Sequence, residues 1–315
     1  MSKRRAGAPA PWLGPRFRPA AWLAWLLAVF PALPPAPAGA AELPGHPRLT
    51  ADGRGGLFGG YQIASGERNE FELFHIRPGG GPESLGRFSG LLAGVAALSD
   101  GQRLALTRDG ALIRLGDDLS SLALPDSRWN MLDLAGLSDG PAALHYQDGE
   151  LWLARPEAPD TWRLEGGAPL VRDPQLAKAA LIESGDEAHL VWSGGANDLS
   201  RGALRHLVRR PSGWEELAPL PLGDVSDFAL FDGGGALDLA ALVPHPLEQG
   251  PARLATRRWR PSSWSEGREL PESLTLSLSE AFGLAAALPA SGLAPAWLSV
   301  GPRGVTLDGL TLWAP

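Results

Sequence analysis

Residues Val95–Leu115 read VAALSDGQRLALTRDGALIRL, three short apolar runs separated by Asp100-Gly101 and Asp109-Gly110. An Asp-Gly pair between alternating apolar runs is a strong hairpin signal, because both turn positions need residues that tolerate positive φ. Apolar runs of this length fit β-strands, and the stretch lacks the long 3.6-residue period of a helix. It therefore predicts a small antiparallel sheet built from consecutive strands.

The same unit of strand, turn, strand, turn and strand recurs along the chain. The first turns of successive copies are about 45 residues apart. They lie at Asp52, Asp100, Asp139, Asp186, Asp232 and Ser291. The copies cover residues 48–77, 95–115, 134–155, 179–210, 228–259 and 283–313. Residues 176–182 are the stretch that could best form a helix, and the repeat predicts a strand there instead.

This repeat predicts an all-β fold, a β-propeller of six blades. One small twisted sheet cannot bury both of its faces, whereas sheets packed radially cover each other and protect their edges. Seven blades are the alternative, because the wider interval before Ser291 leaves room for further strands. A β-sandwich or a β-helix fits less well, because six units exceed one sandwich and a β-helix has shorter repeats. We expect the C-terminal hairpin, residues 305–313, to lie in the blade beside the first.

The composition agrees with a folded, turn-rich chain. Of 315 residues, 40 are Gly, 30 are Pro and none is Cys. Hydrophobic residues make up 44% and charged residues 20%, which is typical of a globular protein and not of a disordered one. Without cysteine, disulfides, a thiolate nucleophile and Cys-ligated zinc are excluded.

The N-terminus has the parts of a secretory signal peptide. Residues 1–19 carry five basic side chains and no acidic one, Ala20–Phe30 is an apolar run, and Ala38-Gly39-Ala40 is a cleavage motif. The apolar run is about half the roughly 20 residues that a spanning helix needs. We therefore predict a signal peptide at 1–40 and a single propeller domain at 41–315, exported to the periplasm or the extracellular space. An uncleaved membrane anchor is the alternative.

Charge narrows the range of partners. Removal of residues 1–40 takes away five basic residues and no acidic ones, so the net charge falls from −7 to −12. A nucleic-acid surface needs a basic stripe, and docking on anionic lipid needs a basic cluster. Neither nucleic acid nor a membrane span after cleavage is expected.

Three tryptophans occur at the ends of similar segments of the repeat. They occur in Pro159-Asp160-Thr161-Trp162, Pro211-Ser212-Gly213-Trp214 and Ser262-Ser263-Trp264. Together with the layout of residues 184–217, this pattern resembles the blades of sialidase-like, Asp-box β-propellers. Their box is Ser-x-Asp-x-Gly-x-Thr-Trp; the tryptophan is kept here, with Thr161 in one copy, but the Asp and Gly of the box are missing from all three. The structural interpretation is an apolar plug under a tight outer turn.

The resemblance implies a catalytic set that can be looked for. Sialidase-like hydrolysis uses an arginine cluster, a tyrosine nucleophile with a glutamate partner, and an acid/base aspartate. The family's tyrosine lies late in the chain, whereas Tyr61 and Tyr146 both lie in the first half. Its first arginine lies in Phe-Arg-Ile-Pro, whereas residues 74–78 read FHIRP. Both departures argue against a sialidase, although an unrelated pair of catalytic carboxylates stays open.

The sequence contains no motif for a metal site, a nucleophilic serine or a phosphate-binding loop. The histidines form no zinc array, and a nucleophile elbow, a P-loop and an EF-hand loop are all missing. No metal or cofactor is expected. The histidines are interpreted mainly as strand residues with satisfied hydrogen bonds. They are His46, His75, His145, His189, His206 and His245.

Loop length provides the remaining functional signal. Connections between second and third strands are predicted to be short at 108–110 and 147–149, and long at 65–69, 193–202 and 244–251. Such loops share one rim of a propeller, and function tends to lie on loops held by a rigid scaffold. The candidate ligand-binding residues are Arg68, Asn197, Asp198, Arg201, His245 and Glu248.

The sequence thus favours an exported, non-catalytic propeller that binds a glycan or a protein partner at one rim. An exported glycoside hydrolase of sialidase-like ancestry and an envelope assembly or structural protein are the alternatives. The candidate loops could also be merely solvated, since Asn197 and Asp198 are common turn formers.

Overall fold

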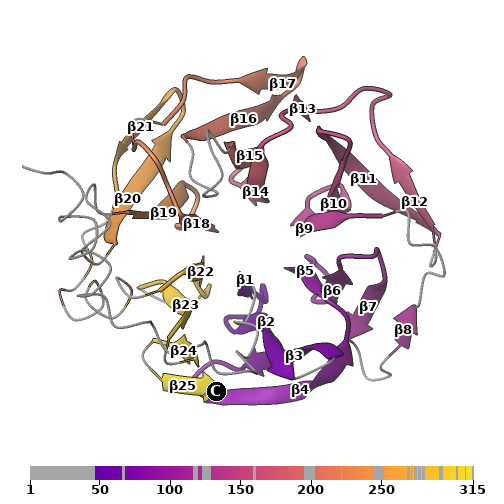
Figure 1. The fold of residues 1–315 in the computed structure, drawn as a ribbon, viewed down its shortest axis with the longest axis vertical. Helices are drawn as coiled ribbons and strands as arrows, with labels where there is room; N and C mark the ends of the chain where they lie inside the picture. The colour runs from indigo at the N-terminus through magenta and orange to yellow at the C-terminus, as the bar shows by residue number, and fades with distance from the viewer. Residues whose placement is uncertain are drawn as a thin grey trace, which may run out of the picture. The chain divides into compact units, whose positions relative to one another are not determined.

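The computed structural model contains six antiparallel sheets arranged radially around a centre (Figure 1). Each sheet, called blade 1 to blade 6 in chain order, consists of consecutive strands. The predicted signal segment lies outside the described residues. Those are residues 47–313 except 66–67, 116–119, 123–128, 159–160, 195–202, 221, 245–251, 268–269, 271, 273–274, 276–277, 279–280, 291–293, 303 and 309.

The first strand of each blade lines the centre, and the second strand pairs with it. The inner strands are β1 (Arg48–Ala51), β5 (Leu92–Ala97), β9 (Met131–Leu137), β14 (Leu176–Ser184), β18 (Asp227–Asp232) and β22 (Gly283–Ala287). The second strands are β2 (Leu57–Ser65), β6 (Arg103–Thr107), β10 (Gly140–Gln147), β15 (Glu187–Gly194), β19 (Leu237–Val243) and β23 (Ala296–Gly301).

The third and fourth strands continue each blade outward. The third strands are β3 (Arg68–Ile76), β7 (Leu112–Leu115), β11 (Glu150–Ala158), β16 (Leu204–Arg210), β20 (Arg253–Arg260) and β24 (Gly304–Leu307). The outer strands are β4 (Pro82–Ser89), β8 (Ser120–Leu122), β12 (Thr161–Leu164), β17 (Gly213–Glu216), β21 (Ser263–Glu266) and β25 (Leu310–Trp313). In blade 3 the short strand β13 (Val171–Arg172) also pairs with β11.

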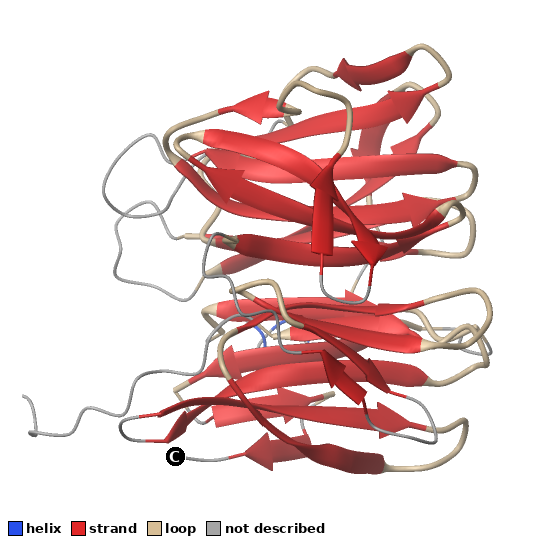
Figure 2. Cartoon of the chain, turned by 90° about the vertical axis from the view of Figure 1, so that its right-hand side faces the viewer, coloured by secondary structure: helices blue, strands red, loops and turns tan. Residues whose placement is uncertain are grey.

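The predicted all-β propeller of six blades is confirmed, and the alternative of seven is not. Every repeat copy found in the sequence corresponds to one blade, and residues 176–182 form a strand. Strands dominate the edge-on view (Figure 2), and the described helical residues are Glu272, Thr275 and Leu278, between blades 5 and 6.

The Asp-Gly turns act as their chemistry predicts. Between β10 and β11, Gln147 pairs with Glu150, so the turn has two residues. Asp148 has φ 53° and Gly149 has φ 83°, which is the positive-φ pair of a type I′ hairpin. Its twist matches that of the flanking strands, and the two strands therefore continue directly as neighbours.

The ring closes by packing between blades, because each blade contains only consecutive strands. Blade 6 ends with the C-terminal hairpin β24–β25 and lies beside blade 1, as predicted. Tyr61 and Phe74 of blade 1 share a buried cluster with Leu298 and Val305 of blade 6. At the inner strands, a Cβ on Gly283 would lie 2.9 Å from Pro47 Cδ, so glycine permits close contact where the ends of the ring meet.

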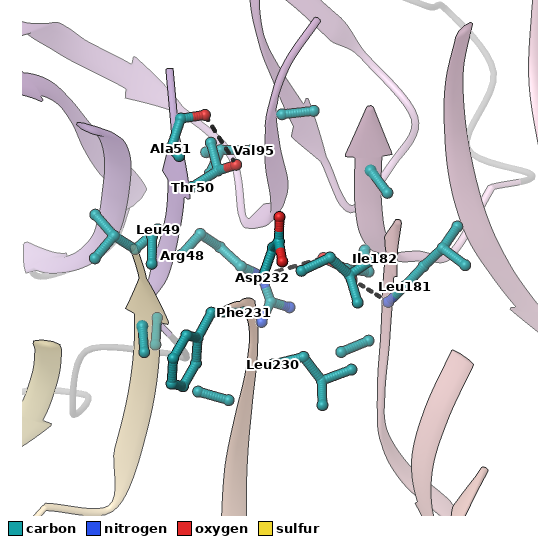
Figure 3. A pocket seen from close by; sticks show the side chains of 18 of the residues that line it. Arg48, Leu49, Thr50, Ala51, Val95, Leu181, Ile182, Leu230, Phe231 and Asp232 are labelled. Atoms are coloured by element: carbon teal, nitrogen blue, oxygen red, sulfur yellow. Dashed lines mark hydrogen bonds and ion pairs between the residues drawn. The ribbon is translucent and has the colours of Figure 1, made fainter. Parts of the chain in front are cut away.

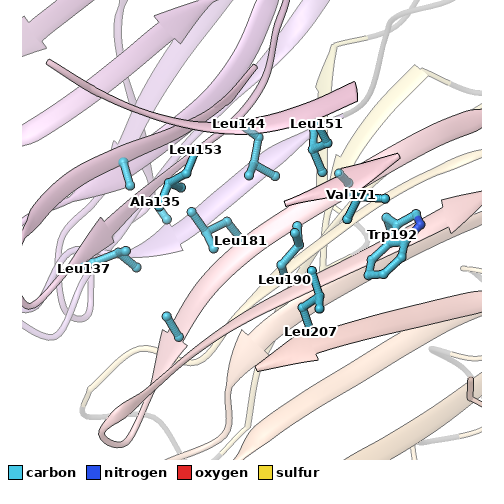
Figure 4. Close-up of a cluster of buried hydrophobic side chains, with 13 residues drawn as sticks. Ala135, Leu137, Leu144, Leu151, Leu153, Val171, Leu181, Leu190, Trp192 and Leu207 are labelled. Atoms are coloured by element: carbon cyan, nitrogen blue, oxygen red, sulfur yellow. The ribbon is translucent and has the colours of Figure 1, made fainter. Parts of the chain in front are cut away.

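Large apolar side chains fill the spaces between blades. Figure 4 shows the cluster between blades 3 and 4, in which Leu144 and Leu151 pack with Leu181, Leu190 and Trp192. Each of these leucines contributes about 1.5–3 kcal/mol by leaving water. Such interfaces explain why consecutive small sheets form one ring.

The repeated tryptophans belong to these interfaces. Trp162, Trp214 and Trp264 lie on the fourth strands and pack against clusters shared with the preceding blade. Trp162 is buried, and its Nε1 donates to the Gly110 carbonyl of blade 2 at 2.9 Å. This arrangement agrees with the structural interpretation of these residues as plugs.

Candidate functional site

A central cavity of about 480 Å³ runs along the inner strands of all six blades (Figure 3). Small residues bring these strands close together. A Cβ on Gly94 of β5 would lie 2.3 Å from the Leu134 nitrogen of β9, and one on Gly136 would lie 2.5 Å from the Ala97 carbonyl oxygen. Glycine is required at both positions, since a side chain would push blades 2 and 3 apart.

The candidate loops leave the sheets at one end of this channel. Lys178, near the start of β14, pairs with Ser193, just before the segment 195–203. Asp227, at the start of β18, pairs with Leu242, just before the segment 244–252. We call this end, where the inner strands begin, the loop end.

One predicted loop is wrong. Residues 65–69 do not form a long connection, because β2 extends to Ser65 and pairs there with Arg68, the first residue of β3. The polar run around Asn69 suggested a loop, but cross-strand pairing continues through it. Since Gly60 already pairs with Arg48 of β1, the rest of this hairpin extends beyond the loop end and carries Arg68 near its tip.

The other predicted site residues lie outside the described part of the chain. Only the strand ends that flank them are placed, and these belong to blades 4 and 5 at the loop end. The predicted site residues that lie outside the described part are Asn197, Asp198, Arg201, His245 and Glu248.

A buried ion pair lies beside these strand ends. Lys178 Nζ donates to Asp227 Oδ1 at 2.5 Å and to the Phe228 carbonyl at 2.6 Å. The second oxygen of Asp227 accepts from the Leu284 N–H of blade 6 at 2.7 Å. Burial lowers the pKa of Lys178, although Asp227 favours the charged amine.

Arg48 and Asp133 lie at the same end of the channel. Arg48 Nε donates to the Ala93 carbonyl at 2.5 Å and Nη2 to the Leu132 carbonyl at 2.8 Å. Asp133 Oδ2 accepts from the Leu181 N–H at 2.8 Å. Burial raises the pKa of Asp133, and the positive charge of Arg48 opposes that rise. Together with the Lys178–Asp227 pair, these contacts link the inner strands of all six blades.

The opposite end of the channel is acidic and is occupied by turn contacts. Asp232 Oδ1 accepts from Ser184 Oγ at 3.0 Å and from two backbone N–H groups of its own turn. A Glu183 oxygen accepts from the Ser138 N–H. These carboxylates already stabilise turns, and the candidate site is therefore the loop end.

The two tyrosines, Tyr61 and Tyr146, do not line the central channel. Tyr61 is buried between blades 1 and 6, where burial raises its pKa. Tyr146 donates its hydroxyl to the Asp173 carbonyl at 2.9 Å. Among the described residues that line the channel, none is a tyrosine.

Four histidines lie in strands, as predicted: His75, His145, His189 and His206. His46 and His245 lie outside the described residues. Within the described ranges, no three His, Cys, Asp or Glu side chains gather as they would around a metal ion.

Sequence reasoning missed the charged groups of the channel. Lys178 was the available signal, because it is the only lysine after Lys3 and lies in the otherwise apolar run 176–182. Arg48, Asp133 and Asp227 also occur near the starts of apolar inner strands. Their convergence depends on the relative placement of different blades, which the repeat alone does not give.

Comparisons with known proteins identify the fold alone. No protein-family model matches the chain, and no curated protein matches its sequence. Its structure is similar to a Hadza microbial sialidase, with a TM-score of 0.55 and 12% identity, over 86% of this chain and 66% of that one. This chain therefore spans slightly less than two thirds of that sialidase.

Two further solved structures match with lower TM-scores. A putative 6-phosphogluconolactonase from Bacteroides uniformis has a TM-score of 0.48 and 13% identity, over 82% of this chain and 79% of that one. The β-propeller domain of a Pyrococcus furiosus protease has a TM-score of 0.43 and 11% identity, over 84% and 81%. Among the described residues, no helix has the length and apolar character needed to span a bilayer.

Proposed function

We propose that this protein is exported and binds a glycan, without cleaving it, at the loop end of the propeller. One observation carries the proposal: a 480 Å³ cavity runs along the inner strands, and charged side chains of several of these strands line it at the end from which the two long loop segments leave. Small-molecule sites have volumes of about 300–1,000 Å³ and combine apolar walls with a few fixed polar groups. A flat, apolar rim would have favoured a protein partner.

The non-catalytic part of the proposal rests on how the charged groups are used. Arg48 and Lys178 already bind carbonyl or carboxylate oxygens of the protein. Catalysis of the sialidase type also requires a tyrosine near the bound sugar. Both described tyrosines have other surroundings, so binding is the activity that the described residues support.

A glycan array on the purified protein tests this function. We expect binding to a subset of oligosaccharides, and a loss of about tenfold or more in affinity when Asn197 and Asp198 are both replaced by alanine. Arg163→Ala is the control, because this exposed residue lies on the outer strand β12, away from the channel.

Three results would overturn the proposal. One is a protein that binds no glycan on the array. Another is a loop variant that binds like the unchanged protein. The third is release of shorter sugars from a bound oligosaccharide, which would support the hydrolase alternative.

A further inference from the structure

A gap separates two fixed and opposite charges at the loop end. Arg48 Nε and Asp133 Oδ1 are 4.0 Å apart, which is too long for a hydrogen bond. Both side chains keep a small exposed fraction, 14% and 11%. Because the Nε–H of Arg48 is donated to the Ala93 carbonyl, a hydroxyl that bridges the pair accepts from another N–H of the guanidinium and donates to the carboxylate.

The protein holds both groups in place without using all of their hydrogen-bonding capacity. Arg48 contacts two carbonyls through Nε and Nη2, and a guanidinium has five N–H groups. The Asp133 contact with Leu181 involves Oδ2, whereas Oδ1 is the oxygen that faces Arg48. Groups oriented before binding lose little freedom when a ligand arrives.

The charges at the loop end balance. Arg48 and Lys178 supply two positive charges, and Asp133 and Asp227 supply two negative ones. An acidic sugar would add an unpaired negative charge to a partly desolvated site that already holds two carboxylates, which is unfavourable. An uncharged polyol adds none, and its hydroxyls both donate and accept.

The walls suit a sugar ring as well. Leu49, Ile182 and Leu230 line the same cavity as Arg48 and Asp133, and their side chains are partly exposed. The C–H faces of a pyranose can pack on such side chains while its hydroxyl groups reach the charged pair. Apolar walls around a few fixed polar groups are the usual composition of a small-molecule site.

We propose that the ligand of this site is an uncharged sugar whose hydroxyl groups bridge Arg48 and Asp133. The inference rests on the proposed glycan-binding function and adds the chemical class of the ligand. It also distinguishes this site from a site that binds an acidic sugar, which would require arginines without neighbouring carboxylates.

Titration calorimetry with matched neutral and acidic sugars tests the proposal. The neutral probes are lactose, maltose and cellobiose, and the acidic probes are 3′-sialyllactose and a glucuronate-containing disaccharide. We expect at least one neutral probe to bind about tenfold or more tighter than any acidic probe.

Asp133→Asn provides a signature that a merely structural role would not produce. The amide keeps an oxygen for the Leu181 N–H but removes one negative charge. Affinity for the neutral probe should fall about tenfold, and the preference over the acidic probes should shrink or reverse. Glu215→Gln, on the outer strand β17 and 61% exposed, is the matched control and should change neither value. Thermal unfolding of each variant verifies that it is folded.

The outcomes separate the two proposals. Preference of the unchanged protein for an acidic probe would overturn the inference and leave glycan binding intact. Unaltered affinities in a folded Asp133→Asn variant would overturn it as well. If none of the probes binds, the inference is wrong, and the glycan array then decides whether the proposed function fails with it.

Discussion

Replacement of Lys178 by methionine is expected to destabilise the fold by about 3–5 kcal/mol, because it removes the buried ammonium group that pairs with the Asp227 carboxylate. The Lys178 side chain is 9% exposed and that of Asp227 is fully buried. The loss of one partner of such a pair costs far more than the pair itself contributes. Denaturant unfolding monitored by tryptophan fluorescence measures the change.

Two comparisons separate this effect from a general loss of packing. Lys178→Met combined with Asp227→Asn should recover a large part of the loss, because the buried carboxylate charge is removed together with the amine and the amide oxygen can still accept from the Leu284 N–H. Arg205→Ala removes one partner of an exposed pair with Glu216 and should cost about 0–1 kcal/mol. Equal losses for Lys178→Met and Arg205→Ala would refute the account of the channel charges.

Acid is expected to destabilise the protein strongly below pH 6.5, through a histidine pair between blades 4 and 5. Trp264 Nε1 donates to His206 Nδ1 at 3.2 Å, so His206 carries its proton on Nε2 and donates to His189 Nδ1 at 3.1 Å. A proton added to either acceptor nitrogen would place two donors face to face. Protonation and this hydrogen-bond chain therefore exclude each other.

The sign of the effect follows from the pKa values. Burial lowers the pKa of His189 to about 4 and that of His206 to about 3, where the charge of His189 contributes as well. In the unfolded chain both have the ordinary value near 6.5. Between these limits the unfolded state binds more protons, so the stabilisation is full above pH 6.5 and decreases as the pH falls, by up to ~1.4 kcal/mol per pH unit for each histidine.

Other groups around the pair also matter for its test. Glu187 Oε2 lies 3.9 Å from His189 Nε2 and also contacts Arg210, and Trp259 packs against both imidazoles. Unfolding free energies at pH 7, 6, 5 and 4.5 should fall steeply for the unchanged protein. Replacement of both histidines by glutamine should flatten this dependence, whereas Arg163→Ala on the outer strand β12 should keep it. If the double variant does not fold, NMR titration of the imidazoles replaces it, and values near 6.5 in the folded protein would contradict the prediction.

The sequence predicted the strands well, because their signals are local. The Asp148-Gly149 turn and the alternation around it need only neighbouring residues, and the repeat then supplies the blade. The error at residues 65–69 has the same origin. A run of polar residues suggests a loop locally, but strands β2 and β3 pair through it, because cross-strand neighbours compensate for weak strand propensity.

The channel charges illustrate what a sequence pattern does not contain. Arg48 and Leu132 are 84 positions apart, and Lys178 and Asp227 are 49 apart. Their contacts depend on how the inner strands of different blades align around the centre. Hydrophobic periodicity fixes which face of a strand is buried, but it does not fix that alignment.

Saturation-transfer-difference NMR on a mixture of the protein and its best array oligosaccharide tests the central claim most directly, because one sample reports both binding and cleavage. We expect transfer from the protein to the sugar ring protons and an unchanged set of anomeric signals after a day at 25 °C. Absence of transfer, or the growth of new reducing-end anomeric signals, would contradict it.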